Sequence, residues 1–154
     1  MNDITTHACW IIIDCWENQP LEDIKIFPNI NEKNYEVANN ISNYIVNVKH
    51  CVVSCNTPVM PQFKNLLNVK GDQKMLLEYI KTHSLKSLIY TGFHDGLCIL
   101  YKEFTGAKYM SNHVDCFIKS DLVCNVPELL KQPYLEPPEV TIQYLNSQYF
   151  KGII

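Results

Sequence analysis

Short apolar runs alternate along the chain with longer stretches in which apolar and polar positions mix. The runs are rich in β-branched and aromatic residues and are apolar at nearly every position, a pattern typical of strands in a parallel sheet covered on both faces. The clearest runs predict strands at Ala8–Ile13, Cys51–Cys55 and Leu85–Thr91, and weaker ones at Leu66–Lys70, Asp115–Asp121 and Tyr149–Ile154.

The segments between these runs show helical spacing. Apolar residues recur every three or four positions from Glu32 to Val48, and shorter stretches predict helices at Lys74–Thr82, Asp95–Phe104 and Glu139–Asn146. Strands that alternate with helices favour right-handed crossovers and helices on both faces of the sheet. The fold class is therefore α/β, a Rossmann-like three-layer α/β/α sandwich with a mainly parallel sheet of about five to six strands.

Composition narrows the class of protein. A chain of 154 residues with 47% hydrophobic and 19% charged residues fits one globular domain, residues 1–154, and it has no apolar run long enough to span a bilayer. All 13 basic residues are lysine and the formal net charge is -3, which disfavours nucleic acid as a partner.

The N-terminus has no basic region followed by an apolar one, so we expect a cytoplasmic protein with no membrane partner. The seven cysteines are odd in number and scattered through apolar segments, unlike a secreted disulfide framework. Most of them are expected to be reduced and buried.

Three chemically useful side chains follow predicted strands. Asp14, Lys70 and Cys98 each lie at or after the carboxyl end of a strand, and parallel strands bring such ends to one rim. A cysteine nucleophile needs a proton acceptor, a charge partner and an oxyanion site. In this hypothesis Asp14 is the base, Lys70 the charge partner and Cys98 the nucleophile, with backbone N–H groups near Leu97 and Cys98 as the oxyanion hole.

These residues resemble the isochorismatase-like cysteine hydrolases, which include nicotinamidases, carbamoylsarcosine amidohydrolases and ureidoacrylate hydrolases. The segment 11–18 resembles the first strand of that family with its terminal aspartate, Val69-Lys70 resembles the strand-end lysine, and 88–99 resembles the nucleophile turn with its glycine and cysteine. The resemblance covers most of the chain. It implies hydrolysis of a small amide or ureido C–N bond through a Cys98 acyl intermediate, and assembly as a homo-oligomer, a dimer or tetramer.

The chain also departs from the family. Trp16 replaces a usual glutamine, the connection after Lys70 is short, and Cys55 to Met60 replaces the aspartate and histidines with which nicotinamidases bind metal. We therefore predict no metal and no cofactor. Trp16, Phe63 and His94 are the candidate substrate-binding residues.

Simpler interpretations exist for each residue. Cys98 alone is compatible with a buried structural thiol, and Asp14 with a helix or loop cap. Most lysines are surface groups, and Lys74 competes with Lys70 for the catalytic role. His94 suits either substrate contact or support of the turn. The alternative function is a catalytically inactive binding or regulatory protein with the same fold.

Overall fold

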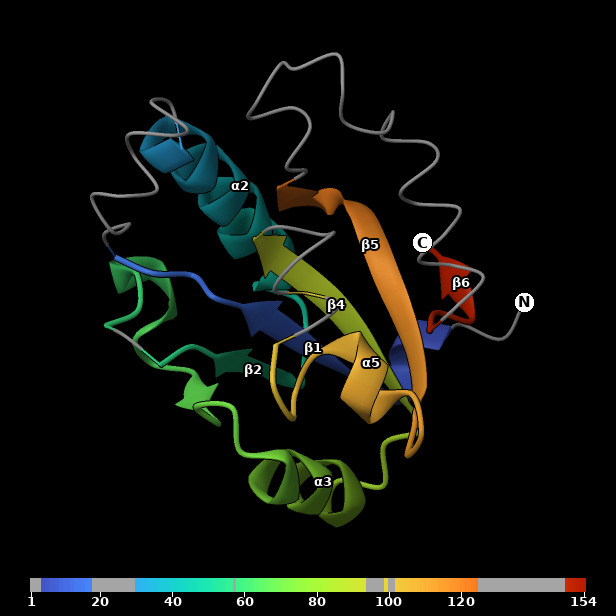
Figure 1. Cartoon of the computed structure of the whole chain (residues 1–154). Coiled ribbons are helices and arrows are strands. Elements are labelled where there is room, and N and C mark those ends of the chain that lie inside the picture. The colour runs from blue at the N-terminus through green and yellow to red at the C-terminus, as the bar shows by residue number, and fades with distance from the viewer. Residues whose placement is uncertain (1–3, 18–29, 57, 94–98, 100–101, 125–148) are drawn as a thin grey trace, which may run out of the picture.

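The computed structural model describes residues 4–17, 30–56, 58–93, 99, 102–124 and 149–154 (Figure 1). In chain order the elements are η1 (Ile4–His7), β1 (Ala8–Ile13), α2 (Ile30–Ile45), β2 (Cys51–Ser54), η2 (Pro61–Phe63), β3 (Leu67–Asn68), α3 (Gln73–Thr82), β4 (Ser87–Phe93), α5 (Ala107–Met110), β5 (Asp115–Cys124) and β6 (Gly152–Ile153).

The strands form one sheet, in the order β3-β2-β1-β4-β5-β6. Every pair of neighbouring strands is parallel. The chain winds from β1 outward to β3 on one side and from β4 outward to β6 on the other, so the direction of winding reverses between β1 and β4. In open parallel sheets such a switch point opens a crevice at the carboxyl ends of the strands, where ligands bind.

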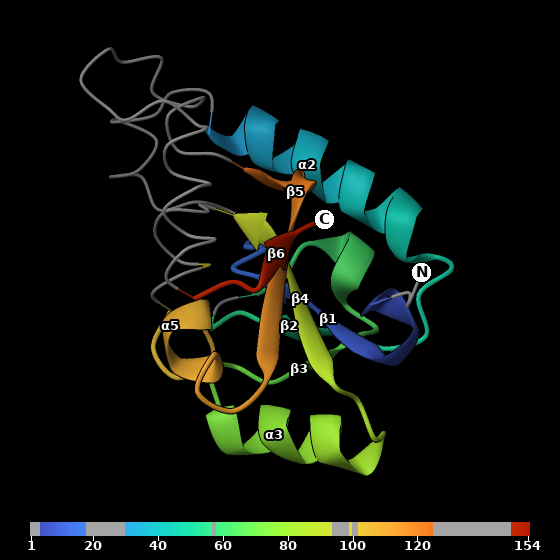
Figure 2. The ribbon, with the colours of Figure 1, turned by 90° about the vertical axis from the view of Figure 1, so that its right-hand side faces the viewer.

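The side chains of β1 alternate between two cores. Cys9, Ile11 and Ile13 pack in the core that includes residues of α3 and α5, whereas Ala8, Trp10 and Ile12 pack with residues of α2 and η2. Figure 2 shows α2 on the opposite side of the sheet from α3 and α5. Both faces are therefore covered, and the predicted three-layer α/β fold is confirmed.

Several predicted boundaries shift. β1 begins and ends as predicted, whereas β4 begins and ends two residues later than predicted, and the last strand shortens to β6. The predicted helix 95–104 lies mostly outside the described residues, but residues 102–106 form turns and a bend, so its end at Phe104 is wrong. The predicted helix 139–146 lies outside the described residues.

Gly92 allows β1 and β4 to lie close together beside the switch point. It pairs with Ile13, and an added Cβ would lie 2.5 Å from the Ile13 carbonyl oxygen. Its φ of +110° is also one that residues with side chains rarely adopt. Only glycine fits this position without a backbone shift.

Gly92→Ala is expected to lower the free energy of unfolding by at least about 3 kcal/mol, because strain and a backbone clash add. Guanidinium denaturation measures the loss. Gly152→Ala is the matched control: its added Cβ would meet the Phe117 ring at 3.4 Å, an ordinary contact, and should change stability by less than about 1 kcal/mol. Equal losses in the two variants would contradict the close approach at Gly92.

Candidate active site

Asp14 directly follows β1 at the switch point. It is 3% exposed, and its backbone N–H donates to the Ser54 carbonyl at 3.0 Å, which ties it to the end of β2. Its φ of 54° lies in the left-handed region, which aspartate tolerates better than most residues. The chain thus turns sharply at Asp14 and leaves a carboxylate buried at the carboxyl end of the central strand.

The Asp14 carboxylate has a lysine partner that the sequence did not indicate. The Lys102 ammonium donates to Asp14 Oδ1 at 2.7 Å. The lysine side chain is 10% exposed and the aspartate side chain 4%. Two opposite charges buried at hydrogen-bond distance form an ion pair that is little screened by water.

Buried polar contacts hold the turn that carries Lys102. The Lys102 carbonyl accepts from the Gly106 N–H at 2.8 Å. Thr105 is fully buried, its hydroxyl lies 2.9 Å from that of Ser54, and its carbonyl accepts from the Tyr90 hydroxyl at 2.6 Å. The turn is therefore fixed to both β2 and β4, on either side of β1.

Lys70 lies at the same rim, after β3. Its φ is 50°, and its own N–H donates to Asn68 Oδ1 at 2.9 Å, while the next N–H, of Gly71, donates to Ser54 Oγ at 3.0 Å. The strand ends therefore converge as expected. The Lys70 side chain is exposed, however, and its ammonium makes no ion pair with the residues that the structure describes.

The predicted nucleophile and its neighbours lie outside the described residues. This holds for Cys98, for Leu97 of the predicted oxyanion hole and for His94. Their roles stay predictions. β4 precedes these residues and is buried throughout. It pairs with every residue of β1, so the C-terminal end of β4 lies beside Asp14.

The two aromatic candidates for substrate contact have different environments. Phe63 is fully buried in the core under α2. Trp16 is half-buried, pairs with Val59 across a short bridge and follows Asp14 by two residues. Its indole N–H is buried and has no hydrogen-bond partner among the described residues. Of the two, Trp16 is the one with surface still available to a substrate.

Burial makes several of the other cysteines poor nucleophiles. It raises the pKa of Cys51 and of Cys116 to about 12, and it raises the pKa of Cys9 as well. A hydrogen bond with Cys55, together with burial, raises the pKa of Cys15. These thiols stay protonated at neutral pH and serve as internal references for the reactivity of Cys98.

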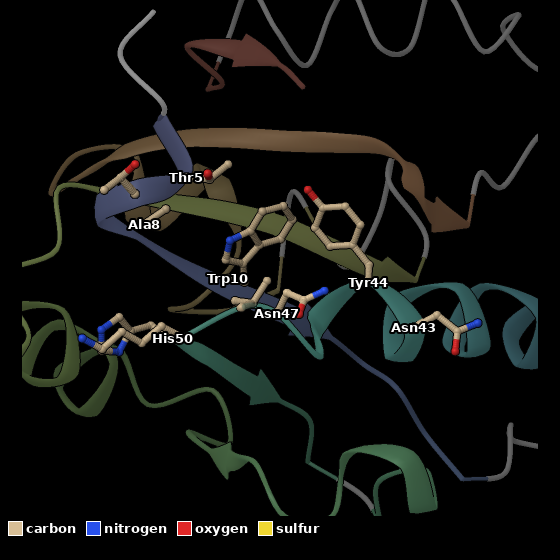
Figure 3. A pocket seen from close by; sticks show the side chains of 10 residues that line it. Thr5, Ala8, Trp10, Asn43, Tyr44, Asn47 and His50 are labelled. Atoms are coloured by element: carbon tan, nitrogen blue, oxygen red, sulfur yellow. The ribbon is translucent and has the colours of Figure 1, made fainter.

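A pocket of about 570 Å³ lies at the opposite end of β1 (Figure 3). It is lined by η1, the start of β1 and the C-terminal end of α2, with Trp10 and Tyr44 in ring contact at 5.1 Å. Asp14 lies six residues beyond Ala8, roughly 20 Å along an extended strand. This pocket is therefore separate from the Asp14–Lys102 pair.

The described residues contain neither a cluster of metal-ligand side chains nor a helix that could cross a membrane. No cluster of three or more His, Cys, Asp or Glu side chains suitable for a metal ion occurs among the described residues. Within the same residues, no helix has the length and apolar character needed to cross a membrane.

The chain has the isochorismatase-like α/β fold. No family model and no curated protein matches the sequence. The solved structures below share the fold at low sequence identity.

The chain is similar to YcaC of Escherichia coli, described as an octameric hydrolase of unknown specificity, with a TM-score of 0.57 and 14% identity over 96% of this chain and 74% of that one. It is similar to YcaC of Pseudomonas aeruginosa, solved with hexane-2,5-diol and covalent acrylamide (TM-score 0.55, 13% identity, 96% and 75% covered). A cysteine hydrolase of Pseudomonas syringae pv. phaseolicola 1448A matches with a TM-score of 0.58 and 9% identity, over 96% and 88%.

Proposed function

We propose that this protein is a metal-independent cysteine hydrolase that cleaves an amide or ureido C–N bond of a small molecule. The observation that carries the proposal is the buried carboxylate of Asp14 at the switch point between β1 and β4. A carboxylate taken out of water at the ligand-binding edge of a parallel sheet is a suitable general base.

The carboxylate has one oxygen to spare. Among the described residues Oδ1 accepts from Lys102, and Oδ2 has no partner. In the first step Oδ2 takes the Cys98 thiol proton and the thiolate attacks the substrate carbonyl carbon. The C–N bond then breaks, Asp14 returns the proton to the leaving nitrogen, and the acyl group stays on sulfur as a thioester.

The second half of the cycle uses water. Asp14 takes a proton from a water molecule, whose oxygen attacks the thioester carbon. The C–S bond breaks, the acid is released and Cys98 recovers the proton. The backbone N–H groups of Leu97 and Cys98 would hold the oxyanion in both halves, and Trp16 and His94 would contact the substrate. A lysine ammonium beside Asp14 supplies the charge partner of the site, the role for which the sequence predicted Lys70.

The Cys98 thiol is expected to react with iodoacetamide at pH 7 at least about tenfold faster than Cys51 or Cys116, whose burial keeps them protonated. Peptide mass spectrometry of the native protein measures each rate. Asp14→Asn should slow labelling at Cys98 and leave the references unchanged. Labelling of Cys98 as slow as that of the references would contradict the proposal and favour an inactive binding protein.

Substrate class is tested by turnover. A panel of small amides and ureido compounds is assayed for release of ammonia or amine, with Cys98→Ala as the inactive control.

Homo-oligomeric assembly belongs to the same proposal and is supported by the octamer reported for the Escherichia coli protein.

A further inference from the structure

The charge partner of Asp14 comes from a part of the chain that the sequence did not assign. Lys102 follows β4, and its ammonium bonds Asp14 Oδ1 at 2.7 Å with both side chains nearly removed from solvent. A buried carboxylate stays charged only if it is paired, because an isolated ion loses most of its hydration. Lys102 supplies that pairing.

Several hydrogen bonds fix the turn that carries Lys102. Its turn is held by Thr105, which contacts the Ser54 hydroxyl and accepts from Tyr90, and by Gln73, whose side-chain amide donates to the Phe104 carbonyl at 3.2 Å. A surface lysine that meets a carboxylate by chance has no such support, and exposed pairs are worth little. Here α3, β2 and β4 all fix the turn that carries the ammonium.

Lys102 also lies close to Cys98 along the chain. They are four positions apart, which limits the distance between their Cα atoms to about 14 Å even in a fully extended chain. Lys70, by contrast, has an exposed side chain, and its ammonium has no ion pair within the described part of the chain. Among the residues that the structure describes, Lys102 is therefore the cation that meets the carboxylate, and it belongs to the segment that follows the predicted nucleophile.

We propose that Lys102, rather than Lys70, is the lysine that pairs with Asp14 and positions it to accept the Cys98 thiol proton. The proposal rests on the cysteine hydrolase function above and moves the cation of its site from β3 to the turn after β4. Lys102 is a positioning residue, since it acts through Asp14. It binds Oδ1 and leaves Oδ2 for the proton, so one ammonium sets both the charge and the orientation of the base.

The test compares lysine variants by the rate of Cys98 alkylation with iodoacetamide at pH 7. Lys102→Met keeps the apolar stem and removes the charge, and it should slow labelling at least about tenfold. Lys102→Arg keeps the charge and should stay within about threefold of the wild type. Lys81→Met, a change at an exposed lysine of α3, is the control and should leave the rate unchanged.

A second neutral variant guards against loss of the fold. Lys102→Gln retains a hydrogen-bond donor for Asp14 without the charge, and it should slow labelling as Lys102→Met does. Circular dichroism checks that each variant is folded. A merely structural role predicts slow labelling in Lys102→Met but near wild-type rates in Lys102→Gln, and that result would overturn the proposal.

Two further outcomes separate this inference from the function on which it rests. If wild-type Cys98 reacts rapidly and Lys70→Met slows it while Lys102→Met does not, the charge partner is Lys70 and the hydrolase function stands. If wild-type Cys98 reacts no faster than Cys51 and Cys116, the function fails and the role of Lys102 fails with it.

Discussion

Lys102→Met is expected to lower the free energy of unfolding by about 3–5 kcal/mol, because it leaves a buried carboxylate without its partner. Asp14→Asn should lose a similar amount, since the ammonium of Lys102 is then the unpaired charge. The pair is 2.7 Å long and its side chains are 10% and 4% exposed, so water cannot replace the missing partner. Guanidinium denaturation at pH 7 measures both losses.

The double variant Asp14→Asn, Lys102→Met separates the contribution of the ion pair to stability from that of side-chain packing. It removes both charges, so its loss should be no larger than that of the worse single variant, which corresponds to a coupling of about 3 kcal/mol or more. The control is the exposed pair of Lys33 and Glu36 on α2, 3.5 Å long, where Lys33→Met should cost less than about 1 kcal/mol. Losses that simply add in the double variant would show that the Asp14–Lys102 pair contributes no coupling.

The main strands and helices of the fold can be predicted from the local pattern of apolar and polar residues. Ala8–Ile13 is apolar at every position because β1 is central and packs on both faces, so its burial is visible in the sequence. The same reasoning locates β4 and the start of α3, where Asp72 caps the helix by accepting from the Met75 N–H at 3.1 Å. The rim position of Asp14 then follows from the direction of β1.

The lysine partner could not be found in this way. Lys102 lies near the end of the predicted helix 95–104 with nothing to distinguish it from other lysines, and its contact with Asp14 spans 88 residues. The contact depends on the adjacency of β1 and β4 and on the Thr105 hydrogen bonds that shape the turn. These features depend on tertiary structure. Lys70, by contrast, was indicated by a local feature of the sequence, its position after a predicted strand.

Burial of individual side chains was equally hard to predict. Phe63 was a candidate for substrate contact, yet η2 places it in the core with Met60, where it is fully buried. Trp16 was predicted to contact the substrate because it follows Asp14 by two residues, and this separation is fixed by the sequence. The sequence therefore places Trp16 close to Asp14, whereas it does not show which way the side chain of Phe63 points.

The thiols buried in the core between the sheet and α3 are expected to lower the free energy of unfolding by about 3 kcal/mol for each pH unit above about pH 9, in addition to the loss from the thiols of Cys15 and Cys51. Cys9 and Cys116 are 0% and 1% exposed in that core. Burial raises the pKa of Cys116 from its ordinary 9.0 to about 12 and also raises that of Cys9. Burial likewise raises the pKa of Tyr90, which is in the same core.

The sign follows from proton binding. Between pH 9 and 12 the unfolded chain releases these thiol protons while the folded chain retains them, so alkali favours unfolding. The stabilisation is fully present below pH 9 and is lost as the pH rises toward 12. Each thiol contributes about 1.4 kcal/mol per pH unit, so two thiols remove about 5 kcal/mol by pH 11.

Guanidinium denaturation under reducing conditions between pH 8 and pH 11 measures this loss. Cys9→Ala should make the slope shallower by about 1.4 kcal/mol per pH unit, because one protonated thiol is gone, even though the variant is less stable at pH 8. Lys74→Met, which changes an exposed side chain, should leave the slope unchanged. A free energy of unfolding that stays constant to pH 11 would mean that the thiols ionise inside the folded sheet, and their burial would then not protect them from reagents that compete with Cys98.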